Sequence, residues 1–392
     1  MATTDSGTAR SRAILEKQRE RLLNIERNGV PTNAYVDALN DLAALLIETD
    51  PAQAQRQLRQ AHLMAAQLQY VPGETRSLTL LSWLHLMGGH PERALVRALQ
   101  AEAVARAAHE PKLEANALYM VSLVHDHVGN FAEALAARER TLILANELAD
   151  PILEGNCRVA MGAQHARRQQ FEEALVCYRQ AYALFVSLDF ARANATLNNI
   201  ATALLGLGRF AEGLELAQQA LAECDRANIR HLTLIMQTIG SAYTAMHAHD
   251  AALGQFVTAL FTHRCAQQDG YLGDATFEAT LLLDMAKAYA ATNNRAMTLG
   301  SLEQALRVCE AIGTQPILAE VHDALSQFYR GVNVWALALA HAEQREKARA
   351  SFQKNESDEY ARVLKVMAVV RAATTRLKLN LSQPQQLNLH KS

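Results

Sequence analysis

Two short histidine-rich stretches of the sequence contain residue types that bind metal ions. One is His125-Asp126-His127 and the other is His247-Ala248-His249-Asp250. Imidazole nitrogens and carboxylate oxygens are ligands that zinc and related ions accept. Neighbouring side chains on a helix point about 100° apart, so adjacent residues do not converge on one ion if these stretches are helical. The sequence therefore argues against a metal site at either place.

A third stretch, ALLGLGRFAEGLEL at residues 203–216, contains a glycine pattern known from nucleotide-binding loops. Gly206, Gly208 and Ala211 fit G-x-G-x-x-[GA], whose backbone N–H groups hold the pyrophosphate of a dinucleotide. Such a loop must follow a β-strand, whereas the preceding TLNNIATALL has apolar residues at helical spacing. We therefore expect no nucleotide cofactor here, and something else must explain the glycines.

Other catalytic signatures are missing from the sequence. It has no G-x-x-x-x-G-K-[ST], no H-E-x-x-H and no G-x-S-x-G motif. The five cysteines lie at least 20 positions apart without a C-x-x-C pair, which argues against a zinc site or a disulfide framework and favours a reducing compartment. We expect no catalytic residues, no cofactor, no metal and no enzyme activity.

The composition favours an all-α protein of the cytoplasm. Half of the 392 residues are hydrophobic, only 6% are aromatic, and there are 8 prolines. The net charge of −2 disfavours a chain that binds nucleic acid or membranes through its overall charge. The first residues have no apolar core of a signal peptide, and no apolar run approaches the ~18 residues of a membrane helix.

One segment recurs along the chain about every 40 residues. GLGRFAEGLELAQQAL, which contains part of the glycine pattern, aligns with HVGNFAEALAARERTL from His127 and RRQQFEEALVCYRQAY from Arg167. Each copy has a small residue after a turn, and a second one lies seven positions later, or two helical turns on. The first set is Ala54, Ala94, Ala134, Ala174, Gly213, Ala252, Thr298 and Ala338, and the second is Ala61, Ala101, Thr141, Ala181, Ala220, Ala259 and Ala305. This periodicity predicts stacked helical hairpins.

The repeat resembles the tetratricopeptide repeat, whose signature is W-x2-L-G-x2-Y followed by A-x3-F. The best copy has Ile239-Gly240-x2-Tyr243 and then Ala252-x3-Phe256, although the leading Trp is missing. The resemblance covers about residues 34–345. It implies a right-handed α-solenoid of about eight helical hairpins with extra terminal helices. In this register Gly208 is the turn glycine and Gly213 is a packing residue of the second helix.

One interval between copies is 46 residues long instead of about 40. It contains CAQQDGYLGDATFEA, residues 265–279, whose two glycines predict an inserted loop or a broken helix. The superhelix is expected to change pitch there.

The first helices of tetratricopeptide hairpins line a concave groove, and the resemblance implies that a partner binds there. Amide side chains donate and accept hydrogen bonds and therefore suit an extended peptide or a partner's tail. The alternative is that these side chains are simply a solvated surface. The Lys/Asn clamp of chaperone-binding members is not recognisable, which disfavours a co-chaperone role. By register the groove residues are Asn116, Tyr119, Asp126, Asn156, Arg167, Asn198, Thr202, Gln237 and Lys287.

Both ends of the chain differ from the repeats. We predict an N-terminal polar tail and capping helix over 1–31, the repeat array over 32–345, a basic coiled-coil-like helix over 346–380 and a disordered tail over 381–392. The N-terminal helix has a narrow apolar seam of Leu15, Leu22 and Ile25, which favours a cap on the first repeat over a partner-binding arm.

The C-terminal helix has its own apolar seam at three- and four-residue spacing, which is typical of a short coiled coil. Tyr360, Val363, Met367 and Val370 are the candidate self-association residues, and Thr374 and Leu377 continue the seam. Past Glu359 the chain has no acidic residue and six basic ones, so its last 33 residues carry +6. A cap packed on the same chain is as compatible with this pattern as a homodimer.

The resemblance implies a non-catalytic module of bacterial signal transduction or regulation that binds a protein or peptide segment. An alternative is an effector-sensing regulator that binds a small peptide or metabolite and signals through its C-terminal helix. A third possibility, association of the basic tail with nucleic acid, is disfavoured.

Overall fold

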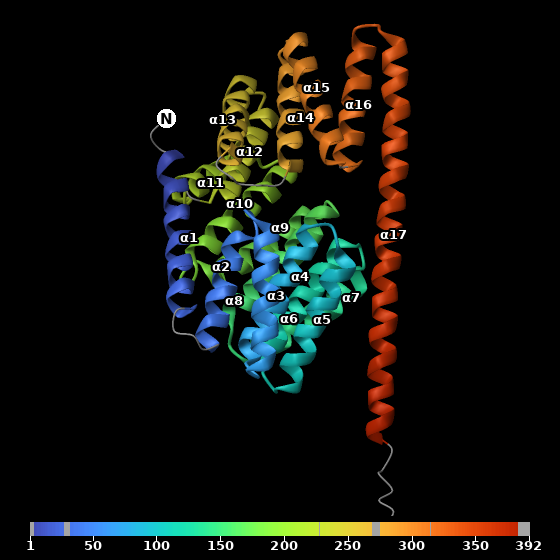
Figure 1. Ribbon diagram of the computed structural model, residues 1–392. Coiled ribbons are helices and arrows are strands. Elements are labelled where there is room, and N and C mark those ends of the chain that lie inside the picture. Colours follow the sequence, from blue (N-terminus) through green and yellow to red (C-terminus); the bar gives the residue numbers. More distant parts are fainter. Residues whose placement is uncertain (1–3, 27–31, 227, 269–274, 314, 383–392) are drawn as a thin grey trace, which may run out of the picture.

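The computed structural model describes residues 4–26, 32–226, 228–268, 275–313 and 315–382, which form seventeen α-helices and no β-strand (Figure 1). This is the all-α architecture predicted from the sequence. The helices are α1 (Thr4–Glu26), α2 (Asn33–Leu46), α3 (Pro51–Gln67), α4 (Val71–Met87), α5 (Pro91–Ala107), α6 (Pro111–His127), α7 (Phe131–Glu147), α8 (Pro151–Arg167), α9 (Phe171–Phe185), α10 (Phe190–Gly206), α11 (Phe210–Glu223), α12 (Ile229–Ala245), α13 (His249–Gln268), α14 (Ala275–Ala291), α15 (Arg295–Ile312), α16 (Gln315–Gly331) and α17 (Trp335–Ser382).

The helices from α2 onward pack in sequential pairs joined by tight turns. In the pairs from α4–α5 onward, the turn contains one residue with a φ between 57° and 75°, in the left-handed region. Gly208 is such a residue, which confirms its role as a turn glycine that needs no nucleotide to explain it. His247 takes the equivalent place one pair later. The set is Gly89, Gly129, Gln169, Gly208, His247, Asn293 and Asn333.

The small residues that define the repeat lie where helices pack most closely. Every member of the second set, from Ala61 to Ala305, is fully buried. In the first set Ala54, Ala94, Ala134, Ala174 and Ala252 are also fully buried, and Thr298 and Ala338 are nearly so. The repeating pattern is thus a packing pattern, as predicted.

Gly240→Leu is expected to lower the free energy of unfolding by roughly 1–3 kcal/mol, because overpacking a full core forces neighbours apart. A Cβ at Gly240 would lie 2.4 Å from Cε1 of Phe256, whose ring is buried in the same pair of helices. Urea unfolding followed by circular dichroism measures the loss. Gly254→Leu is the matched control, because a Cβ there meets nothing within 4 Å among the described residues. Equal losses in the two variants would contradict the packing explanation.

The first helices of most successive pairs also contact one another, as α2 contacts α4 and α12 contacts α14. They form the inner layer of the solenoid, and the second helices form the outer layer. The chain curves round until α1 and α2 lie near α10 and α11 (Figure 1). The handedness of the superhelix and the change of pitch near residues 265–279 stay predictions; residues 269–274 lie outside the described part.

The N-terminal helix α1 packs on α2 through the seam predicted from the sequence. Leu22 is buried, and Leu15 and Ile25 pack beside it against a cluster that includes Leu39 and Leu58. The open end of the first helix pair is thereby covered.

The C-terminal helix α17 is a single helix of 48 residues, about 70 Å long at 1.5 Å per residue. It begins as the partner of α16 and passes along the edge of the molecule to α5 (Figure 1). The predicted boundary at residues 345 and 346 therefore falls inside a helix. Residues of the predicted tail beyond Ser382, and the side chains of Thr374 and Leu377, lie outside what the structure describes.

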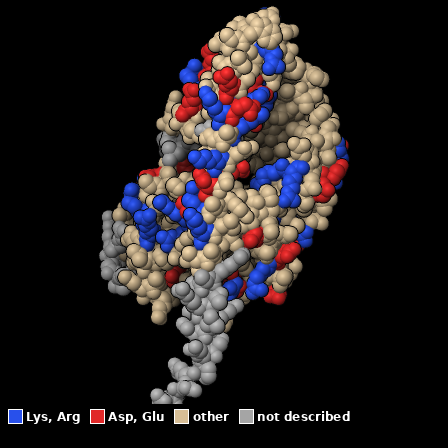
Figure 2. All heavy atoms as spheres, turned by 90° about the vertical axis from the view of Figure 1, so that its right-hand side faces the viewer, with Lys and Arg blue, Asp and Glu red and all other residues tan. Residues whose placement is uncertain are grey.

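Charged side chains of both signs occur on the face along which α17 runs. Figure 2 shows groups of Lys and Arg there with Asp and Glu close by. Among the described residues, no helix is both long enough and apolar enough to cross a membrane.

Candidate ligand-binding cavity

A cavity of about 1130 Å³ lies where the curved solenoid brings its beginning close to its middle. One wall consists of α1 and the C-terminal end of α2. The other consists of the N-terminal halves of α10 and α12 with the turn between α11 and α12. Its volume is slightly above the roughly 300–1,000 Å³ of typical ligand pockets.

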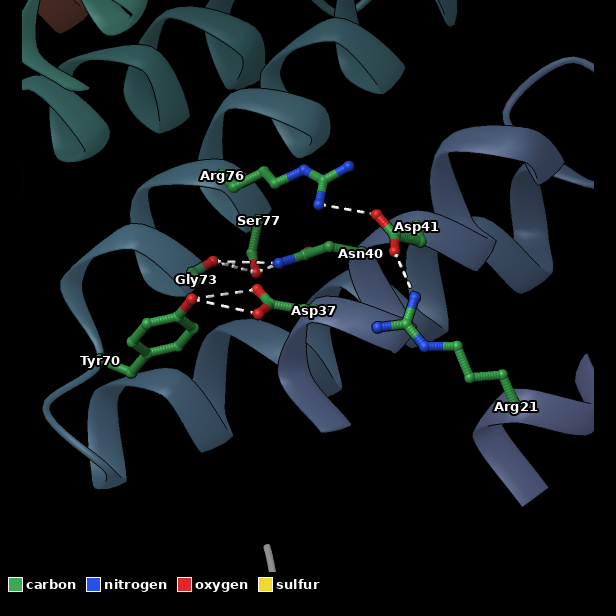
Figure 3. Close-up of polar contacts among 8 residues, drawn as sticks. All are labelled: Arg21, Asp37, Asn40, Asp41, Tyr70, Gly73, Arg76 and Ser77. Carbon is green, nitrogen blue, oxygen red and sulfur yellow. Dashed lines mark hydrogen bonds and ion pairs between the residues drawn. The ribbon is translucent and has the colours of Figure 1, made fainter. Parts of the chain in front are cut away.

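The first wall is fixed by polar contacts among α1, α2 and α4 (Figure 3). The Asp41 carboxylate accepts a hydrogen bond from Arg21 of α1 at 2.9 Å and forms an ion pair with Arg76 of α4 at 2.7 Å. Deeper between the helices, the buried Asn40 amide donates to the Gly73 carbonyl at 3.1 Å and accepts from the Ser77 hydroxyl at 2.9 Å. These contacts link three helices and hold α1 at the edge of the cavity.

A tyrosine completes this polar cluster on α2. The Tyr70 hydroxyl donates to the Asp37 carboxylate at 3.1 Å. Burial and the nearby carboxylate raise the pKa of Tyr70, so the phenol stays protonated and keeps donating.

The second wall carries a hydrogen-bonded pair of polar residues. The Asn194 amide nitrogen donates to the Ala220 carbonyl at 3.0 Å, so its oxygen is left to accept. His231 Nε2 lies 2.7 Å from that oxygen and must therefore carry the proton. Burial lowers the pKa of His231, which favours a neutral imidazole at this place.

Asn198 lies one helical turn beyond Asn194 and lines the same cavity. The residue is only 7% exposed, and its Oδ1 is buried with no hydrogen-bond partner in the described part of the chain. Leaving a buried acceptor unpaired costs about 1–3 kcal/mol. A ligand N–H group would recover that energy if the Asn198 side chain turned its oxygen toward the cavity.

Apolar side chains lie between these polar groups. Ile14, Leu45, Phe190 and Leu234 line the cavity and are each more than a third exposed. At the mouth Arg230 of α12 and Glu48 beyond α2 form an ion pair at 3.4 Å. Both side chains are about half exposed, so the pair stabilises the approach of the two walls by no more than about 1 kcal/mol.

The nine groove residues predicted from the sequence are spread over five inner helices. Of these, Asn198 alone lines the cavity. Asn116 and Arg167 are exposed on α6 and α8, and Thr202 is exposed on α10, where its hydroxyl donates to the Asn198 carbonyl. Asn156 accepts from Arg192 at 3.2 Å. Tyr119 is partly buried, and burial raises the pKa of its phenol to about 12.

The prediction that Asp126 lines the groove and faces a ligand is wrong, because its side chain is buried. Its side chain is 6% exposed and is paired with the Arg138 guanidinium, which is fully buried. Arg138 also donates to Gln164 at 3.2 Å. Asp126 therefore belongs to a buried ion pair between α6 and α7.

Gln237 and Lys287 meet at a carboxylate that sequence analysis did not single out. Asp284 of α14 accepts from Gln237 at 3.0 Å and from Lys287 at 3.2 Å. These two predicted residues thus share Asp284 as a partner, on the inner helices α12 and α14 that follow the α10 helix of Asn198.

The histidines of the first histidine-rich stretch lie in different surroundings. His125 is buried, with its Nδ1 3.3 Å from the Asn130 amide, and His127 is exposed. Within the described ranges, no three His, Cys, Asp or Glu side chains could hold a metal ion together. Burial raises the pKa of the Cys157 thiol to about 12, which keeps it from acting as a thiolate.

The predicted self-association seam of α17 contacts the same chain. Val363 is completely buried in a cluster with Leu95, Ala98 and Val124, and Met367 packs at its edge. Arg362 lies 3.6 Å from Glu92 of α5. While α17 is docked in this way, Val363 cannot contact a second copy, although Tyr360 is 39% exposed.

The sequence missed most of the cavity. Asn194 and His231 could have been found from the register. Asn194 lies on α10 one turn before the predicted groove residue Asn198, and His231 lies near the start of the inner helix α12. The role of α1 and Glu48 had no local signal, because it depends on how far the solenoid curves.

No protein-family model and no curated protein matches this chain. Among solved structures, a Rap protein complexed with competence and sporulation factor matches with a TM-score of 0.61 and 12% identity, over 91% of this chain and 100% of its own. The apo form of the quorum sensor NprR from B. thuringiensis matches with a TM-score of 0.59 and 14% identity, over 88% of this chain and 97% of its own.

A third solved structure is a signal transduction ATPase with a tetratricopeptide repeat sensor from Pyrococcus horikoshii. It matches with a TM-score of 0.59 and 10% identity over 88% of this chain, which spans 55% of the ATPase chain. At these identities the matches show the fold. It is that of a tetratricopeptide-repeat solenoid.

Proposed function

We propose that this tetratricopeptide solenoid is a non-catalytic interaction module of cytoplasmic bacterial signalling, and that it binds a peptide segment in the cavity between α1–α2 and α10–α12. The buried Asn198 oxygen without a partner is the observation that carries this proposal. A peptide backbone has an N–H group at nearly every residue and can supply the missing donor. Exposed apolar side chains such as Phe190 would contact the peptide's side chains.

The structural relatives support a regulatory role. One was solved complexed with a competence and sporulation factor, and another is a quorum sensor. Both share the fold over most of this chain. A cavity with walls on two sides suits the recognition of a short signal. A scaffold protein would be expected to present a flat surface.

The test begins with peptides selected from a phage-displayed random library on the wild-type protein. Synthetic copies of the best binders are then titrated by calorimetry. Phe190→Ala combined with Asn198→Ala is expected to weaken binding roughly 10- to 100-fold, because it removes an aromatic anchor and a hydrogen bond. The melting temperature is expected to stay nearly unchanged, since Phe190 is 61% exposed and the Asn198 oxygen has no partner to lose.

The matched control is Phe261→Ala combined with Asn146→Ala. Phe261 is 56% exposed on α13, and Asn146 is an exposed amide on the outer helix α7 outside the cavity. This pair should leave affinity as it is. If both double variants bind equally well, the peptide binds elsewhere and the proposed site is wrong.

The long helix α17 favours a second candidate function, an effector-sensing regulator that signals through this helix. It is anchored on α16 at one end and docks on α5 near Val363. The cavity spans α2 to α12 of the same superhelix, so a ligand that changes the curvature also changes the spacing between α16 and α5. By thermodynamic reciprocity, undocking α17 must then change ligand affinity.

A further inference from the structure

The walls of the cavity carry an excess of negative charge. Five carboxylates line it, those of Glu16, Glu48, Asp50, Glu223 and Asp225, against the two guanidinium groups of Arg19 and Arg230. The net charge of the lining is thus −3, while the whole chain of 392 residues carries only −2. A cleft lined by one sign of charge concentrates ligands of the opposite sign.

Both cationic groups of the lining already have acidic partners. Arg19 contacts Glu16 at 2.8 Å within α1, and Arg230 contacts Glu48 at 3.4 Å across the mouth. On the opposite wall Glu223 accepts from the neutral Gln219 amide at 3.1 Å. An anionic ligand would therefore have to displace a carboxylate, whereas a carboxylate that already has a partner can still accept from a cationic ligand, because its two oxygens accept several hydrogen bonds.

The buried polar group of the cavity has the same preference. Asn198 is 93% removed from solvent, and its unpaired atom is an oxygen, which accepts. Lysine and arginine side chains are donors only. The lining charge and Asn198 are independent features, and both favour a ligand with hydrogen-bond donors.

A ligand can displace the exposed ion pair between Arg230 and Glu48 at the mouth of the cavity. Its two side chains are 41% and 50% exposed, so it is worth no more than about 1 kcal/mol. A ligand cation can replace Arg230 at Glu48 with little loss. The carboxylates of Glu223 and Asp225 line the same cavity.

From these features we infer that the cavity selects a basic peptide segment, with lysine or arginine side chains held by Glu223, Asp225 and Glu48 and an N–H group held by Asn198. Apolar residues of the segment lie against Phe190 and Leu234. This inference rests on the proposed function and adds the charge of its ligand.

The experiment uses the full chain and a random peptide library displayed on phage. Selected sequences are expected to be enriched in lysine and arginine. Glu223→Gln combined with Asp225→Asn is expected to weaken the synthetic peptides by about tenfold or more, since hydrogen bonds to charged groups are the stronger ones. Raising the salt concentration should weaken wild-type binding as well.

Glu356→Gln combined with Asp358→Asn is the matched control. It removes the same two carboxylates at the same spacing from an exposed part of α17, and it should not change affinity. Circular dichroism checks that both variants are folded.

The outcomes separate this inference from the proposed function. Peptides without basic enrichment that lose affinity in the Phe190 and Asn198 variant but not in the Glu223 and Asp225 variant would overturn the inference and leave the proposed function standing. Selection of acidic peptides would do the same. If no selected peptide depends on any cavity residue, the proposed function fails and the inference fails with it.

Discussion

Arg138→Met is expected to lower the free energy of unfolding by about 3–5 kcal/mol, because it leaves a buried carboxylate without its partner. The Arg138 side chain is completely buried and that of Asp126 is 6% exposed. Methionine fills much of the space but offers no donor, so the Asp126 carboxylate stays in an apolar place or forces α6 and α7 apart. Urea unfolding followed by circular dichroism measures the loss.

Two controls show whether the lost partner is the cause. Replacing both residues, with Asp126→Leu added to Arg138→Met, should recover most of the stability, since apolar replacement of a whole buried pair is often neutral. Arg140→Met should change stability by no more than about 0.5 kcal/mol. Arg140 is 59% exposed, and its ion pair with Glu114 is long, at 3.6 Å. A double variant as unstable as the single one would contradict the explanation.

Val363→Asp is expected to release the C-terminal part of α17 from α5. The valine is fully buried among apolar side chains, and an unpaired carboxylate there costs several kcal/mol. Undocking the end of a helix costs less than burying that charge. Hydrogen exchange over residues 355–370 should accelerate, since a helix without packing partners is marginal in water.

Val369→Asp is the control for this substitution. Val369 lies on the same helix and is 69% exposed, so its replacement should leave exchange unchanged. If exchange in the Val363 variant is also unchanged, the docked arrangement does not hold in solution. Peptide affinity measured on the same variant tests whether α17 and the cavity are coupled.

The same pair of variants tests the predicted homodimer. A seam formed by Tyr360, Val363, Met367 and Val370 between two chains would give a wild-type dimer by light scattering and a monomer in the Val363 variant. A wild-type monomer would leave only the contact with α5.

The sequence predicted the features that repeat. Small residues 40 positions apart had to be buried because helices of each pair approach closely there, and Ala94 and Ala101 show no exposed surface. The turn position was equally local, since Gly208 and His247 recur at the same place in the register. Such features depend on neighbours within one or two helices.

One departure from the repeat could have been interpreted further. Arg138 takes the position that Phe256 has in the best copy, four residues after the small residue. A charge in a core position demands a partner, and Asp126 is the acidic residue at the end of the preceding helix. The register alone therefore contained the buried pair.

The cavity could not be predicted in this way. Its walls are at least 140 residues apart in sequence, and Glu48 and Arg230 are 182 apart. Their approach depends on the sum of many small rotations between helix pairs, and no single residue encodes that sum. Only Asn198 was found, because its place on an inner helix is a local property.

The contact between α17 and α5 also bears on how the chain is made. Asn130, in the turn before α7, and Met367, beside this contact, are 237 positions apart. Most of a solenoid folds through neighbours only, so α2 to α9 can fold as they leave the ribosome. The apolar surface around Leu95 then waits uncovered until residue 363 has been synthesised, some tens of seconds later at about 5–20 residues per second. During that interval the nascent protein exposes an apolar, aggregation-prone surface that α17 later covers.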